Sequence, residues 1–130
     1  LSVYIQACRC VPLEVEAWEK VSRLQLSRGL REEAVNTLLK GQRFFRGRAL
    51  REKAIRLLRR AWEVVPWHFE VTLELARLLA KNKDKDEALR LLRGLAGREE
   101  GRNLRRIRGA IMRISPTPAS AWQWLRLRKG

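Results

Sequence analysis

The stretch AIRLLRRAWEVVP, residues 54–66, decides the fold of this chain. Its apolar residues recur every three or four positions, the spacing of one face of an α-helix. Extended backwards by a few residues, that face comprises Leu50, Ala54, Leu57, Leu58, Ala61 and Val65. Arginine and glutamate occupy the opposite side, and Pro66 ends the helix because it lacks an amide donor and disfavours helix at the residue before it. The sequence therefore predicts an amphipathic helix over 48–65.

The same pattern recurs along the chain at fixed steps. Pro12, Pro66 and Pro116 are each followed six residues later by a core candidate, and these are Trp18, Thr72 and Trp122. Ala54 and Ala88 are 34 residues apart, as are Leu58 and Leu92. Self-similarity at such a period is typical of stacked helical hairpins, in which each unit buries its apolar face against its neighbours.

Helical periodicity extends over the rest of the chain, and no segment has the alternation of a β-strand. It predicts about seven helices, over 1–10, 14–28, 31–45, 48–65, 68–82, 85–96 and 101–114, followed by a last one over 117–128. Gly29 and the Asn82–Asp84 stretch mark tight turns in which a positive φ is tolerated. The predicted fold class is all-α.

At these positions the chain resembles the tetratricopeptide repeat (TPR) family, whose repeats pair a helix bearing Trp-x2-Leu with a second helix bearing spaced small and large apolar residues before a proline. The second-helix pattern is matched by Ala54, Leu58, Ala61 and Pro66, and Leu75, Ala76, Leu79, Ala88 and Leu92 continue it. Less complete copies contain Trp18, Val21, Gly29, Ala34 and Leu38, and then Pro116, Trp122 and Leu125. The resemblance implies a right-handed α-solenoid of antiparallel helix hairpins that serves as a binding scaffold.

One departure from a regular array leaves the repeat register open. Arg46 and Glu100 stand where a regular array would place proline, and the observed prolines are 54 and 50 residues apart. Each unit either holds a third helix beside its hairpin, or 34–47 is a short first helix of its own repeat with Phe45 at the aromatic position. We expect residues 1–130 to form a single TPR-like segment of a longer array, with units of roughly 12–65, 66–115 and 116–130.

The tryptophans are interpreted mainly as packing residues. Trp18 and Trp122 stand where a repeat fills the space between its helices, and Trp62 and Trp67 flank the corner at Pro66. Trp124 lies on the other side of the last predicted helix from Trp122. It is either a contact to a following helix or an exposed binding residue.

The sequence offers little for catalysis or for cofactor binding. His68 is the one histidine, and Cys8 and Cys10 fall on opposite sides of a helix, where they cannot form a disulfide with each other. Two cysteines without nearby histidines are too few for a closed zinc site. We therefore predict no enzyme activity, no catalytic residues, no cofactor and no metal. The unpaired cysteines favour a cytoplasmic or nuclear location, and no apolar run is long enough to cross a bilayer.

Charge is the remaining functional signal. Lysine and arginine number 29 against 14 aspartate and glutamate residues, a net charge of +15. Nine basic residues and one acidic residue lie between Lys40 and Arg60, and six basic residues lie between Arg98 and Arg113. At helical spacing these runs place arginines in rows away from the apolar face. The candidate partner-binding residues are Arg56, Arg60, Arg102, Arg106 and Arg113.

Three functions remain open at this point. The first is a protein–protein interaction scaffold that holds an acidic surface or peptide of a partner protein in its groove and on its basic surface. The second is binding of nucleic acid or another anionic polymer by the arginine rows. The third is a spacer whose charge is incidental. Terminal helices without polar caps also predict self-association.

Overall fold

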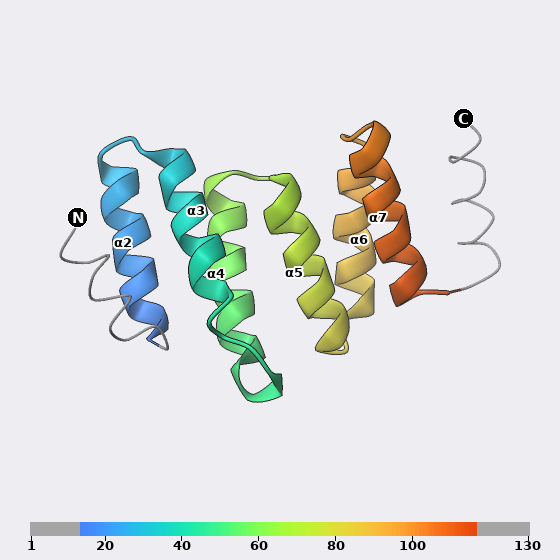
Figure 1. The fold of residues 1–130 in the computed structure, drawn as a ribbon, viewed down its shortest axis with the longest axis horizontal. Coiled ribbons are helices and arrows are strands. Elements are labelled where there is room, and N and C mark those ends of the chain that lie inside the picture. Colours follow the sequence, from blue (N-terminus) through green and yellow to red (C-terminus); the bar gives the residue numbers. More distant parts are fainter. Residues whose placement is uncertain (1–13, 117–130) are drawn as a thin grey trace. The chain divides into compact units, whose positions relative to one another are not determined.

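The computed structural model describes residues 14–116, and every regular element within that range is helical (Figure 1). The elements are α2 (Val15–Ser27), α3 (Arg31–Gln42), the 3₁₀ turn η1 (Arg48–Leu50), α4 (Arg51–Val64), α5 (Phe69–Lys81), α6 (Lys85–Ala96) and α7 (Gly101–Ile114). The all-α prediction is thus confirmed. The helices expected over 1–10 and 117–128, and with them Cys8, Cys10, Trp122 and Trp124, lie outside the described residues.

The chain divides into two compact units between Val71 and Thr72, inside α5. The first unit contains α2, α3, η1 and α4, and the second contains most of α5 together with α6 and α7. None of the described helices is long and apolar enough to cross a membrane.

In the first unit, α3 packs against both α2 and α4. Its contact residues alternate small and large side chains. Ala34 and Leu38 of α3 are fully buried, as are Leu58 and Ala61 of α4. Small residues let two helix backbones approach closely, and leucines fill the remaining space. The apolar face that the sequence predicts is therefore the face that forms the core.

Two turns show the repeat at the level of individual hydrogen bonds. After α2, Gly29 takes φ 75°, and the amide of Leu30 donates to the carbonyl of Gln25. After α5, Lys83 takes φ 66°, and the amide of Asp84 donates to the carbonyl of Leu79. Both are Schellman caps, which satisfy the last carbonyls of a helix. The two caps are 54 residues apart, the step that also separates Pro12 and Pro66.

The helix predicted over 31–45 is wrong at its end, because α3 stops at Gln42. The amides of Arg43, Phe44 and Phe45 each donate to a carbonyl three residues back, which tightens the chain into a turn. Gly47 follows at φ 87°, a conformation that a helix cannot contain. Phe45 still reaches the core, but Phe44 points out of it and is 48% exposed. The helix predicted over 48–65 likewise begins with the 3₁₀ turn before α4.

In the second unit, α6 packs against α7. Ala88, Leu92 and Leu95 of α6 are fully buried, and Ile107, Ala110 and Ile111 form the buried face of α7. The boundaries of both helices agree with the predicted spans. These alternating small and large residues give the second unit the same packing scheme as the first.

Replacing Ala88 with leucine tests that scheme. Because Ala88 is fully buried, the larger side chain overfills the core, and we expect the free energy of unfolding to fall by about 1–3 kcal/mol. Denaturant unfolding followed by circular dichroism measures the change. Ala49→Leu, at an exposed alanine, is the control and should change stability by less than about 0.5 kcal/mol. Equal stability of the two variants would contradict close packing at Ala88.

Candidate functional site

Arg56 and Arg60, two of the predicted binding residues, both reach a glutamate of another helix. They lie one turn apart on α4, and Glu19 lies on α2. Arg56 Nη2 donates to Glu19 Oε1 at 2.6 Å and its Nε to Oε2 at 3.2 Å, while Arg60 Nε donates to the same Oε2 at 2.6 Å. Glu16 lies 3.9 Å from Arg56 and adds a weaker ion pair. This arrangement, the Glu19 cluster, ties α2 to α4.

Burial makes the Glu19 cluster electrostatically unusual. The side chain of Glu19 is 2% exposed, whereas those of Arg56 and Arg60 are 50% and 47% exposed. Burial by itself would raise the pKa of Glu19, but the hydrogen bonds and charges of the two arginines outweigh it, so the pKa lies below its ordinary value. The hydrogen bond to Glu19 in turn raises the pKa of Arg56. The carboxylate is therefore ionised at neutral pH and held by two cations.

Sequence reasoning placed the two arginines on a free row and missed their partner. On α2, Glu19 lies four residues after Val15 and three before Ser22, and both of these residues are buried. At this helical spacing Glu19 falls on the buried face of the helix. A charged residue on such a face calls for a buried ionic partner. The sequence therefore indicated that Glu19 has an ionic partner. It did not indicate which residue that partner is, because Arg56 lies 37 residues away.

The other predicted row lies on α7. Arg102, Arg106 and Arg113 are exposed, on the side away from the buried face of the helix. The row extends for about 16 Å at the rise of an α-helix. Arg108 is different: its Nε is buried without a hydrogen-bond partner among the described residues, and burial lowers its pKa.

Arg113 also lines a cleft of about 480 Å³ in the second unit. Three helices contribute to its walls, and the lining residues are Arg77, Ala80 and Lys81 of α5, Lys85 of α6, and Ala110, Arg113 and Ile114 of α7. Four of the seven are cationic, and none is acidic. We call this the basic cleft. Sequence reasoning found Arg113 but missed the three cations of α5 and α6, which only the helix packing brings beside it.

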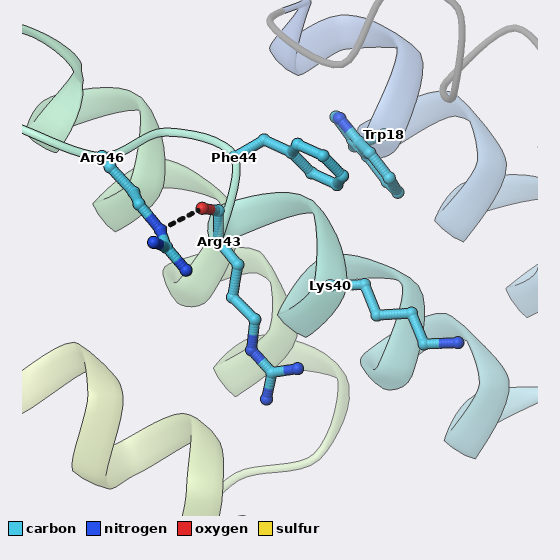
Figure 2. Close-up of a pocket in the computed structure, with 5 residues that line it drawn as sticks. All are labelled: Trp18, Lys40, Arg43, Phe44 and Arg46. Atoms are coloured by element: carbon cyan, nitrogen blue, oxygen red, sulfur yellow. Dashed lines mark hydrogen bonds between the residues drawn. The ribbon is translucent and has the colours of Figure 1, made fainter.

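A second cavity, of about 570 Å³, lies in the first unit where α3 ends. Figure 2 shows its aromatic wall, in which the ring of Phe44 faces the indole of Trp18. The two rings stack with their centroids 5.5 Å apart and their planes 22° from parallel. Trp18 is 7% exposed, as its predicted packing role requires, while Phe44 stays 48% exposed. We call this the aromatic pocket.

Gly41 allows Trp18 to lie so close to α3. A Cβ atom at this position would meet three ring atoms of the indole at 2.6–2.9 Å, well inside van der Waals contact. The absence of a side chain on Gly41 therefore lets the indole lie flat against α3, and the indole in turn supports the ring of Phe44.

Three cations complete the lining of the aromatic pocket. They are Lys40 from the last turn of α3, and Arg43 and Arg46 from the turn that follows (Figure 2). Arg46 Nε donates to the carbonyl of Arg43 at 3.0 Å, which fixes the start of that side chain. No carboxylate among the described residues forms an ion pair with any of the three.

His68, Trp62 and Trp67 make contacts that belong to the fold. The amide of Val71 donates to His68 Nδ1 at 3.4 Å, at the start of α5. Trp62 and Trp67 meet edge to face with centroids 5.4 Å apart, at the corner beside Pro66. Within residues 14–116, no group of three histidine, cysteine or acidic side chains is placed to hold a metal ion.

Comparison with known proteins identifies the repeats. Residues 51–111 match a family model described as a tetratricopeptide repeat. The match begins at the first residue of α4 and ends within the last turn of α7. It includes five of the seven residues that line the basic cleft, and Arg102 and Arg106 of the α7 row, but not Arg113 or Ile114. Comparison with curated proteins gives no match.

Proposed function

Residues 51–111 belong to the tetratricopeptide repeat family, whose repeats generally mediate protein–protein interaction, and we propose that this chain is a scaffold that binds an acidic segment of a partner protein. The proposal places that segment on the α7 row and in the basic cleft. It assigns the chain a role in binding and not in catalysis.

The observation that carries the proposal is the composition of the basic cleft. Cations from three helices converge there, and no carboxylate is among the lining residues. Arg77, Lys85 and Arg113 form no ion pair within residues 14–116. Converging cations attract carboxylates, and arginine binds them through paired, charge-assisted hydrogen bonds. Ala80, Ala110 and Ile114 give the same cleft an apolar wall for the partner's side chains.

Reversing the charge of the α7 row tests the proposal. We expect Arg102→Glu/Arg106→Glu/Arg113→Glu to weaken binding of a fluorescent acidic peptide with leucine anchors, EELLEELLEE, by about tenfold or more, measured by anisotropy. The physical reason is that each reversal replaces attraction by repulsion at an exposed site. The control, Arg23→Glu/Arg28→Glu/Arg31→Glu, makes the same change of net charge at exposed residues of the first unit and should retain binding. Unchanged binding by the α7 variant would contradict the proposal.

The same variants distinguish a polyanion site. Single-stranded oligothymidine of matched length is the second probe. If nucleic acid is the partner, the logarithm of affinity falls steeply with the logarithm of salt concentration, by about 0.7 per phosphate contacted. An acidic peptide anchored by leucines gives a shallower slope, because part of its affinity comes from apolar burial and from a few side chains. Tighter, steeply salt-dependent binding of the oligonucleotide would replace the proposed partner by nucleic acid.

A further inference from the structure

We propose that the aromatic pocket is a second docking site, which receives one aromatic or large aliphatic side chain of a partner peptide flanked by acidic residues. The inference rests on the proposed function in so far as both involve a protein partner. The site is separate, however: it lies in the first unit, at the end of α3, and shares no residue with the basic cleft.

The apolar part of the site is Phe44. Only Leu26 and Phe44 are large apolar residues exposed within the described part of the chain. Phe44 differs from Leu26 because one face of its ring is supported by the buried indole of Trp18. A ring that is held in place loses little conformational freedom when a ligand covers it, which favours binding. The cavity beside it has the size of ordinary ligand sites.

The charged part of the site fixes the chemistry of the occupant. Lys40, Arg43 and Arg46 surround the aromatic wall without an acidic residue in the lining. A ligand that is only apolar would leave these cations without a partner, and a ligand that is only acidic would leave Phe44 in water. A peptide with one apolar anchor between carboxylates satisfies both.

A single aromatic platform favours a peptide over single-stranded nucleic acid. Proteins that bind such strands stack successive bases on several exposed aromatic rings along a basic groove. Among residues 14–116 one aromatic ring is exposed, that of Phe44, and its stacking partner Trp18 is itself buried in the core. One anchor in one pocket corresponds to the hot-spot geometry of protein interfaces, where a few buried side chains carry most of the affinity.

The experiment measures anisotropy of the fluorescent peptide DEFDE, with DEADE and oligothymidine as the comparison probes, on the full chain. We expect DEFDE to bind at least about tenfold more tightly than DEADE, and Phe44→Ala to weaken DEFDE binding by about tenfold or more. Leu26→Ala, which removes the other exposed apolar side chain, is the matched control and should leave binding unchanged. Circular dichroism verifies that each variant is folded.

Charge reversal gives a second test that does not touch the core. Lys40→Glu/Arg43→Glu should weaken DEFDE binding by about tenfold or more, whereas Arg90→Glu/Arg93→Glu, the same charge change at exposed residues of α6, should not. Equal affinity for DEFDE and DEADE, or binding unaffected by both Phe44→Ala and Lys40→Glu/Arg43→Glu, would overturn the inference. Phe44-dependent binding of oligothymidine that is tighter than that of DEFDE would also overturn it. Loss of DEFDE binding only in the α7 variant would overturn the inference and leave the proposed function standing.

Discussion

Replacing Trp18 with alanine is expected to lower the free energy of unfolding by about 3–5 kcal/mol. The indole is 7% exposed and lies so close to α3 that Gly41 has no room for a Cβ atom. Neighbouring helices cannot collapse fully into the space that the indole leaves, so the variant loses both the burial of the ring and its packing contacts. Denaturant unfolding followed by circular dichroism measures the change.

Leu26→Ala is the control for Trp18→Ala, because it shortens an exposed apolar residue of the same helix. We expect that control to change the free energy of unfolding by less than about 0.5 kcal/mol. Wild-type stability of Trp18→Ala, combined with loss of DEFDE binding, would mean that Trp18 is chiefly a ligand anchor and not a core residue.

Removing both cations of the Glu19 cluster is the second change with a large expected effect. The double variant Arg56→Met/Arg60→Met leaves the Glu19 carboxylate buried without the hydrogen bonds that hold it charged. An uncompensated buried charge is strongly destabilising, and we expect a loss of about 3 kcal/mol at neutral pH. Methionine keeps the length and the apolar character of the arginine stems, so the loss reports the ionic contacts.

The pH dependence of this loss identifies its cause. In the wild-type protein the pKa of Glu19 lies below its ordinary value of 4.5, so its stabilising contribution is present above that value and is lost as the pH falls through the lowered pKa. In the double variant the arginines no longer lower the pKa of Glu19, and burial raises it above 4.5. The destabilisation by the buried charge is therefore complete above this raised pKa, and it disappears once the pH is below 4.5. The stability difference between the two proteins should therefore begin to shrink as the pH falls through the raised pKa of the variant, above 4.5, and should keep shrinking until the pH falls below the lowered pKa of the wild type.

A matched control separates the Glu19 cluster from net charge. Arg48→Met/Lys53→Met removes two positive charges from exposed residues of η1 and α4, and its stability should stay within about 0.5 kcal/mol of the wild type. Denaturant unfolding at a series of acidic pH values gives the free energy of unfolding as a function of pH for the wild type and for both double variants. If the difference in the free energy of unfolding between Arg56→Met/Arg60→Met and the wild type is independent of pH, lost packing, and not the charge of Glu19, causes the destabilisation.

The helices and most of the core could be predicted from the sequence. Helical periodicity within 54–66 depends on residues close in the chain, and the physical rules that it follows are local. The spans predicted over 85–96 and 101–114 agree with α6 and α7. The turn at Gly29 was predictable for the same reason, because a positive φ is a property of the residue itself.

Tertiary structure alone decided which charges meet. The sequence shows Arg56, Arg60 and Arg113 as similar members of helical rows, yet the first two hold the buried Glu19 and the third faces a cleft of cations. Likewise, the periodic pattern continues past Gln42, but the chain turns there and leaves Phe44 exposed against Trp18. Pairing between distant residues depends on how helices pack in space, and periodicity fixes the face of a helix without fixing what lies opposite it.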